Sequence, residues 1–200
     1  MSGKILLFNK WDFSEVVVSD AGLKKYINLS PVIIPKTFGR FSTDSIHKSK
    51  INIIERFINK LAVAGHKGKK HKLTSGHMPG NYQRIMKNVK KAFEIIEKRT
   101  KKNPIQVLVQ AIENAALYEE VASYRVGGII ARKAVVTSPQ RRLDVALRLI
   151  AQDIYSTSFK SKKKLYEVIA EELIMIAEND QRNNVIKERA RIEKEAEGAR

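Results

Sequence analysis

Apolar residues recur three or four positions apart along most of the chain from residue 50 onward. This spacing marks one face of an α-helix, and it predicts helices at about 50–64 and 81–100 and two more that begin near 139 and 161. The stretch that opens at Asn103-Pro104 is apolar nearly all round, which is typical of a central, buried helix. The positions expected in the core are Ile51, Ile54, Phe57, Ile58, Leu61, Ile85, Val89, Ala92, Phe93, Ile96, Leu143, Leu147, Ile150, Ile154, Leu165, Val168, Ile169, Leu173 and Ile176.

One segment departs from the helical pattern. The β-branched runs at 119–126 and 129–137 flank Gly127-Gly128, and a two-glycine turn between such runs is a strong signal for a β-hairpin. A lone two-stranded hairpin is only marginally stable, so we expect an arm at 118–137 that projects from helices at its base. Just after it, Ser138-Pro139 predicts an N-cap and the first residue of the next helix.

The two ends of the chain differ from its middle. Residues 1–48 are predicted to form an N-terminal extension without a long helix, in which 16–18 and 26–29 are candidate short strands. Residues 49–180 form the predicted helical core. Residues 181–200 form a charged C-terminal helix or tail with opposite-charge pairs one turn apart, Arg189–Glu193 and Arg191–Glu195. Few apolar residues support this sixth helix, so we expect it to be weakly anchored and to order only against a partner.

Positive charge dominates the composition. The 200 residues include 38 Lys+Arg and 21 Asp+Glu, a net charge of +17, and the excess lies in residues 1–164. A merely solubilising surface stays nearer a net charge of ~2–8, so a polyanion partner is the favoured interpretation. The absence of cysteine excludes a disulfide scaffold and a cysteine nucleophile. No apolar run approaches the ~18 residues of a membrane helix, and we expect a soluble, cytoplasmic protein without a membrane partner.

Residues 66–81 contain glycine, lysine and three histidines. No cysteine or carboxylate joins His66, His71 and His77, so a zinc site is disfavoured. The glycine–lysine pairs lack the spacing of a phosphate-binding P-loop. We interpret the segment as a basic loop that contacts phosphate, and a merely solvated loop remains the alternative.

Arg141 and Arg142 lie in the first turn of a predicted helix. Cations at a helix N-terminus oppose the helix dipole, and an external anion could offset that cost. This makes the two arginines better functional candidates than scattered lysines, with a solvated first turn as the alternative. The stretch Thr37–Phe41 interleaves aromatic rings with Arg40, which suits either an arm laid along RNA or a hydrophobic patch.

The sequence carries no recognisable catalytic motif. It lacks a Gly-x-Ser-x-Gly elbow, a His-Glu-x-x-His pair and a dinucleotide-binding glycine pattern. We predict that the protein is not an enzyme and has no cofactor, metal or small-molecule substrate. A nuclease site built from Asp44, Glu55 and Glu94 is left open.

Several motifs, in order, resemble the family of small-subunit ribosomal protein seven, which is numbered five in eukaryotes. They are residues 57–65 with the basic loop that follows, residues 103–112, residues 125–128 and residues 138–142. The N-terminal extension and the loop at 66–81 resemble the archaeal and eukaryotic branch. The resemblance implies a six-helix ribosomal protein fold with a projecting β-hairpin arm and an N-terminal extension.

The resemblance also implies a function. The protein would bind ribosomal RNA and organise the 3′ major (head) domain of the small subunit, beside neighbouring head proteins. Its arm would lie near messenger RNA and exit-site transfer RNA. A DNA architectural protein is the rival interpretation, because such proteins also use β-arms. The residues expected to bind RNA are Arg40, Lys60, Lys67, Lys69, Lys70, Lys72, Arg84, Arg125, Gly127, Gly128, Arg132, Lys133, Arg141, Arg142 and Arg148.

Overall fold

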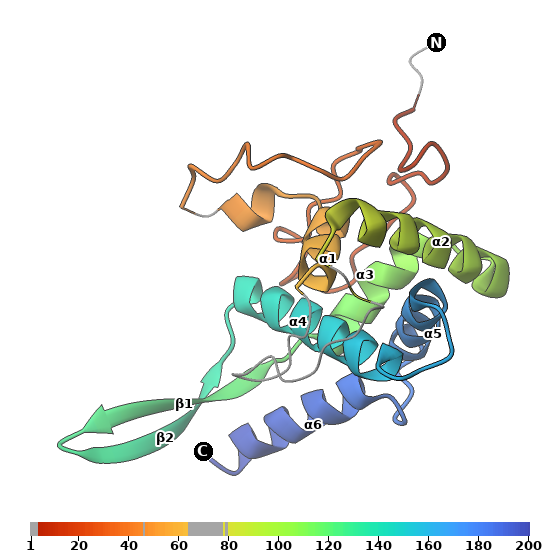
Figure 1. Cartoon of the computed structure of the whole chain (residues 1–200). Helices are drawn as coiled ribbons and strands as arrows, with labels where there is room; N and C mark the ends of the chain where they lie inside the picture. The colour runs from red at the N-terminus through yellow and green to blue at the C-terminus, as the bar shows by residue number, and fades with distance from the viewer. Residues whose placement is uncertain (1–3, 46, 64–77, 79) are drawn as a thin grey trace.

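The computed structural model describes residues 4–45, 47–63, 78 and 80–200, and it shows a helical body with one β-hairpin (Figure 1). The predicted mainly helical class with a projecting arm is confirmed. The elements in chain order are the short 3-10 helix η1 (His47–Lys50), α1 (Ile53–Leu61), α2 (Tyr82–Thr100), α3 (Pro104–Ala115), β1 (Glu119–Val126), β2 (Ile129–Val136), α4 (Pro139–Ser158), α5 (Leu165–Ala177) and α6 (Asn184–Glu197).

Asparagine side chains begin four of these helices. Asn52, Asn81, Asn103 and Asn183 each accept a hydrogen bond from a backbone amide two or three residues further on. Each bond satisfies an amide that has no partner within the helix. Ser138 precedes Pro139 as predicted, but its side chain makes no capping bond. The start of α4 relies instead on the fixed backbone angle of proline and on the Ser138 carbonyl, which accepts from the Arg142 amide at 2.9 Å.

The hydrophobic core surrounds α3, which packs against α2, α4, α5 and α6. Apolar residues on all sides of α3 are buried, as the sequence predicts for a central helix. The predicted core positions of the other helices are also buried, except Ile51, which precedes α1 and is half-buried. In the described ranges, no helix is both long enough and apolar enough to cross a membrane.

The N-terminal segment packs onto the same core. The Trp11 ring meets Phe93 of α2 edge to face with centroids 5.7 Å apart, and its indole N–H donates to Glu97 at 3.1 Å. Burying an aromatic or aliphatic side chain stabilises a fold by roughly 1.5–3 kcal/mol, so this segment adds to the stability of the helical body. The buried apolar residues of the segment are Leu7, Trp11, Phe13, Leu23 and Ile27.

The short strands expected at 16–18 and 26–29 are not formed, and that expectation was wrong. The backbone N–H and C=O of Val17 pair with the side-chain amide of Gln106 in α3, at 2.8 and 3.0 Å, instead of with another strand. Asn28 makes only a single β-bridge, to Asn52. A polar side chain of the helical body thus takes the place of a strand partner, which local sequence cannot reveal.

The predicted arm is confirmed. β1 and β2 pair antiparallel, with Val126 opposite Ile129. The base of the arm packs beside α6, and the tip extends away from the helices (Figure 1). Gly127 and Gly128 have φ angles of 55° and 90°, a left-handed conformation that strains any residue with a Cβ. Most side chains beyond the base are exposed, so the arm carries little of the core.

Helix α6 is anchored within the chain, which corrects the expectation of a weakly held tail. Arg189 donates to the backbone carbonyl of Asn114 at 2.7 Å, and Glu193 accepts from the amide of Tyr118 at 3.0 Å. Both anchors lie 75 positions earlier in the chain, beyond the reach of a periodicity argument. The buried apolar residues of α6 are Val185, Ile186 and Ala196.

The surface of α6 carries the two predicted ion pairs. The Nε atom of Arg189 lies 3.3 Å from a carboxylate oxygen of Glu193, and Arg191 pairs with Glu195. In each pair the two residues are one helical turn apart. The exposed Arg191–Glu195 pair adds only about 0.3–0.5 kcal/mol, so the anchoring of α6 depends on its tertiary contacts.

Candidate nucleic-acid interface

A group of cations meets where η1, α1 and α4 pack together. Lys48, Lys60 and Arg148 reach the surface, whereas Arg56 is buried beneath them and holds Asp144 in place. Lys48 and Arg56 both bind the carboxylate of Asp144, each at 3.0 Å. Lys60 lies one turn after Arg56 on α1, and Arg148 lies one turn after Asp144 on α4. Both cations are near enough to interact electrostatically with this group. We call Lys48, Arg56, Lys60 and Arg148 the α1–α4 basic cluster.

The α1–α4 basic cluster sets four cations against one carboxylate. Burial lowers the pKa of the Lys60 ammonium, and the charges of Lys48, Arg148 and Arg56 lower it further, although Asp144 acts in the opposite direction. Burial alone would raise the pKa of Asp144, but Lys48 and Arg56 outweigh burial and lower it. The cations repel one another, and a bound phosphate would relieve this repulsion.

The structure thus brings together two residues that the sequence predicted, Lys60 and Arg148. Sequence reasoning missed Lys48, Arg56 and Asp144. One signal was available, because Arg56–Lys60 and Asp144–Arg148 are both four residues apart and so share a helix face. Nothing local, however, indicates that these two faces meet across 88 positions.

The arm presents further cations. The strand register places Arg125 opposite Ile130 and Ser123 opposite Arg132, so the two arginines share one face of the hairpin. Lys133 lies on the other face, and all three side chains are exposed. A narrow, exposed ribbon with charge on both faces can enter a crevice between nucleic-acid backbones.

The neighbouring arginines at the start of α4 differ in their surroundings. Arg141 is exposed and pairs with Glu120 of β1, with one Nη–Oε distance of 2.6 Å. Arg142 is buried, donates to the Leu117 carbonyl at 2.8 Å and binds the Asp20 carboxylate at 2.7 Å. Carboxylates of the chain itself therefore offset the cost of two cations at a helix N-terminus, where we expected an external anion.

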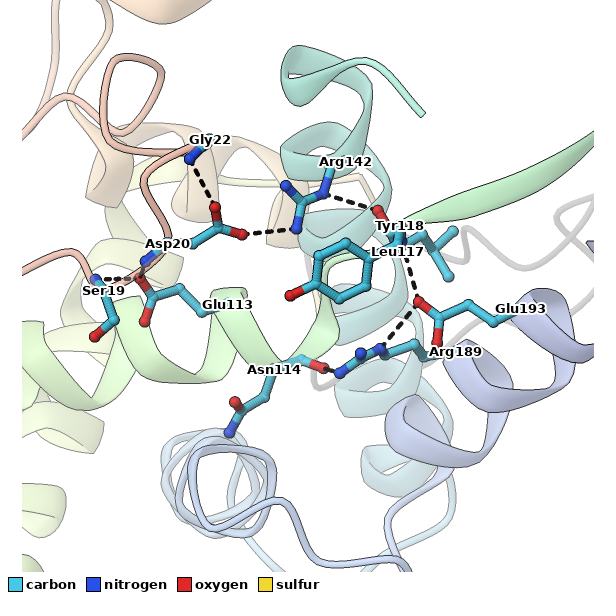
Figure 2. A network of polar contacts seen from close by, with 10 residues as sticks. All are labelled: Ser19, Asp20, Gly22, Glu113, Asn114, Leu117, Tyr118, Arg142, Arg189 and Glu193. Carbon is cyan, nitrogen blue, oxygen red and sulfur yellow. Dashed lines mark hydrogen bonds and ion pairs between the residues drawn. The ribbon is translucent and has the colours of Figure 1, made fainter. Parts of the chain in front are cut away.

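Figure 2 shows that Arg142 belongs to a network joining the N-terminal segment, the end of α3, α4 and α6. Glu113 accepts hydrogen bonds from two amides of the N-terminal segment, at 2.7 and 2.9 Å. The ring of Tyr118 faces the guanidinium groups of Arg142 and Arg189, at 4.5 and 5.5 Å from its centroid. Tyr118 directly precedes β1, so this network fixes the base of the arm, and Arg142 is not available at the surface to contact RNA.

The remaining predicted residues lie in three places. Arg40 is exposed on the N-terminal segment, and Arg84 is exposed in the first turn of α2. Gly127 and Gly128 form the arm tip described above. Outside the described residues lie Lys67, Lys69, Lys70 and Lys72, together with His66, His71 and His77.

The carboxylates considered for a nuclease site each have a different partner. Asp44 binds Lys50 at 2.6 Å, and Glu94 pairs with Lys10 of the N-terminal segment. Glu55 accepts from the backbone and side chain of a threonine, both at 2.9 Å. Within the part of the chain that the structure describes, no three potential metal ligands gather.

A helical body with clustered cations and a charged β-arm is typical of structural proteins that bind nucleic acid. Comparison with known families agrees, since the family described as Ribosomal protein S7p/S5e matches residues 23–200. The chain therefore belongs to this family of structural, non-enzymatic proteins, which confirms the resemblance and the prediction that the protein is not an enzyme.

Curated relatives match over nearly the full chain. The small ribosomal subunit protein uS7 of Nanoarchaeum equitans is 46% identical over 98% of this chain and 100% of its own length. The uS7 proteins of Methanococcoides burtonii and Archaeoglobus fulgidus are 44% and 43% identical, over 87% and 98% of this chain and 88% and 96% of their own lengths. These archaeal relatives agree with the predicted archaeal and eukaryotic branch.

Proposed function

We propose that this chain is a constituent of the small ribosomal subunit and binds ribosomal RNA through the α1–α4 basic cluster and the arm. The observation that carries the proposal is the excess of cations around Asp144 in a member of a ribosomal protein family. The names of the relatives and the net charge of +17 support the same conclusion.

The finer part of the proposal concerns the place of the protein. It organises the 3′ major (head) domain of the RNA beside neighbouring head proteins, and its arm lies near messenger RNA and exit-site transfer RNA. An arm that projects beyond the helices can reach a ligand while the α1–α4 basic cluster holds RNA elsewhere (Figure 1). Arg40, Arg84 and the basic segment at 66–72 supply additional phosphate contacts in this proposal.

The recognition chemistry follows from the residue types. The planar guanidinium of arginine matches two phosphate oxygens at once, whereas the lysine ammonium acts as a point charge. Folded RNA is recognised mainly through its shape, backbone and 2′-hydroxyls, so such a surface selects a folded RNA region and stabilises it. Binding releases counterions and should weaken steeply as salt rises.

The double variant Lys60→Gln/Arg148→Gln tests the α1–α4 basic cluster. Each phosphate contact contributes about 0.9 to the slope of log affinity against log salt, so the slope should fall by about 2. Filter binding of a head-domain RNA transcript over a series of KCl concentrations measures it. The control Lys25→Gln/Lys187→Gln removes the same charge from exposed positions outside the cluster and should leave the slope unchanged. An unaltered slope in the Lys60/Arg148 variant would remove the cluster from the interface.

The DNA architectural alternative predicts a different preference. If the protein binds structured RNA, its affinity for the head-domain transcript should exceed its affinity for duplex DNA of equal length at the same salt concentration. Equal or tighter binding to the duplex DNA would favour the alternative.

Shortening the arm tests its separate role. Replacing residues 122–133 with Gly-Gly keeps Val121 paired with Ala134 and retains the base of the hairpin. Because most of the removed side chains are exposed, we expect the thermal unfolding midpoint to stay within a few degrees. Reconstituted subunits should bind exit-site transfer RNA more weakly. Unfolding of the helical body would show instead that the arm is structural.

A further inference from the structure

A second cationic surface lies where α2 packs against α5. The carboxylate of Glu171 in α5 binds Arg99 of α2 at 3.7 Å and Lys163, from the loop before α5, at 2.6 Å. Nearer the start of α5, the ring of Tyr166 faces two ammonium groups, one from each side of the seam, at 5.4 and 6.0 Å from its centroid. These belong to Lys91 and Lys164. Lys102, which follows α2, completes the group. The name seam cations is used below for Lys91, Arg99, Lys102, Lys163 and Lys164.

The local sequence strengthens this surface. Residues 98–102 and 160–164 together contain eight lysines and arginines and no carboxylate. The packing of α2 against α5 brings both stretches to the same side of the molecule, beyond the end of α4 that is remote from the arm (Figure 1). The facing carboxylates are Glu171 and Glu178, and Glu167 instead caps the first turn of α5 by accepting from the Lys164 amide at 2.9 Å.

A cavity of about 950 Å³ opens beside the seam. Arg99, Lys102 and Lys163 supply its cationic wall, and Val107 and Ile174 form part of an apolar wall. Phosphate oxygens can meet the cations while the less polar faces of a nucleotide rest on the apolar wall. The dimensions and chemistry of the cavity thus suit a segment of nucleic-acid backbone.

We propose that the α2–α5 seam is a second binding site for RNA backbone, distinct from the α1–α4 basic cluster. The inference rests on the proposed RNA-binding function and deepens it. From Lys91 to Arg99 the seam cations extend about 12 Å at 1.5 Å per helical residue, and Lys102 follows the end of α2, so they can follow more than one phosphate. Arg148 and the end of α4 at Ser158 are about 15 Å apart along the helix by the same measure. Two separate cationic surfaces allow one chain to hold two segments of a folded RNA domain, which an RNA-organising protein requires.

The triple variant Lys91→Gln/Lys102→Gln/Lys164→Gln tests the seam. It leaves Arg99 and Lys163 in place, so Glu171 keeps both of its partners. The control Lys24→Gln/Lys25→Gln/Lys187→Gln removes the same charge from exposed positions away from the seam. With the head-domain RNA transcript as probe, the slope of log affinity against log salt should fall by about 2–3 in the seam variant and stay unchanged in the control. Circular dichroism melting verifies that both variants fold.

The outcomes separate this inference from the proposed function. If the seam variant retains the full slope while the Lys60→Gln/Arg148→Gln variant loses about 2, the seam is not an RNA site and the proposed function stands. If the unaltered protein does not bind the transcript, both proposals fail. Poly-glutamate is the second probe. If the seam variant binds poly-glutamate more weakly than the unaltered chain but keeps its affinity for RNA, the seam is a site for an acidic protein partner, and the inference is overturned.

Discussion

Replacing Arg142 with alanine should destabilise the folded chain by about 3 kcal/mol, near the lower end of the range for breaking a buried ion pair. The guanidinium is buried, binds Asp20 at 2.7 Å and donates to the Leu117 carbonyl at 2.8 Å. Its loss leaves a carboxylate and a carbonyl without their strongest partner. The side chain of Asp20 is 20% exposed, so water can partly compensate. Urea unfolding monitored by circular dichroism measures the change.

Arg141→Ala is the matched control, because it removes the adjacent residue of the same type. Arg141 is exposed and its pair with Glu120 lies at the surface, so its loss should cost less than about 1 kcal/mol. If the two variants lose similar stability, Arg142 is not the structural link that Figure 2 shows. Normal stability of Arg142→Ala with weakened RNA binding would return Arg142 to the interface.

The free energy of unfolding of the unaltered chain should fall as pH rises toward 8. The variant Glu172→Gln should remove most of this fall. Glu172 of α5 and Asp153 of α4 are both buried, and the side-chain amide of Asn183 donates to their carboxylates at 2.6 and 3.3 Å. Asn184 donates to the second oxygen of Asp153 at 2.9 Å. Burial, followed by the charge of Asp153, raises the pKa of Glu172 to about 7. These two carboxylates and the amides of Asn183 and Asn184 therefore link α4, α5 and the start of α6.

The sign of the effect follows from proton binding. The pKa of Glu172 is raised above its ordinary value of 4.5, so between about pH 4.5 and 7 the folded chain holds a proton that the unfolded chain has released. The resulting stabilisation is fully present below pH 4.5 and is lost as pH rises through 7. The difference between pKa values of 4.5 and about 7 corresponds to at most about 3.4 kcal/mol of stability.

Urea unfolding at pH 5 and pH 8 checks this prediction. The stability difference between the two pH values should be smaller in Glu172→Gln than in the unaltered chain, and the variant should be the more stable of the two at pH 8. Glu171→Gln is the control, since its carboxylate faces Arg99 and Lys163 at the surface. A Glu172→Gln variant with the full pH dependence would show that Glu172 does not hold a proton in the folded chain near neutral pH.

The helices and the arm follow from short-range patterns. The N-cap at Asn103, the stripe Ile85–Val89–Phe93–Ile96 and the Gly127-Gly128 turn each depend on residues within a few positions. Backbone geometry alone converts such patterns into structure, because helical and extended chains repeat at fixed intervals. The sequence could therefore predict these elements and their buried faces.

The candidate site was only partly predictable. Consecutive helical residues point about 100° apart, so Arg141 and Arg142 face different directions, and nothing in the local sequence says which of them is buried. Which one is buried depends on where the N-terminal segment, with Asp20, crosses α4. In the same way, Lys60 and Arg148 form a cluster only because α1 packs against α4.

By itself, the sequence determined the helical class, the arm, the cationic excess and the resemblance to a ribosomal protein family. Only the tertiary structure decided which cations gather around Asp144 and Glu171, which arginine is internal, and that α6 is anchored by Arg189 and Glu193. The physical reason is that charge and periodicity are properties of the chain. The pairing of one charge with another depends on distances between elements that the sequence places many residues apart.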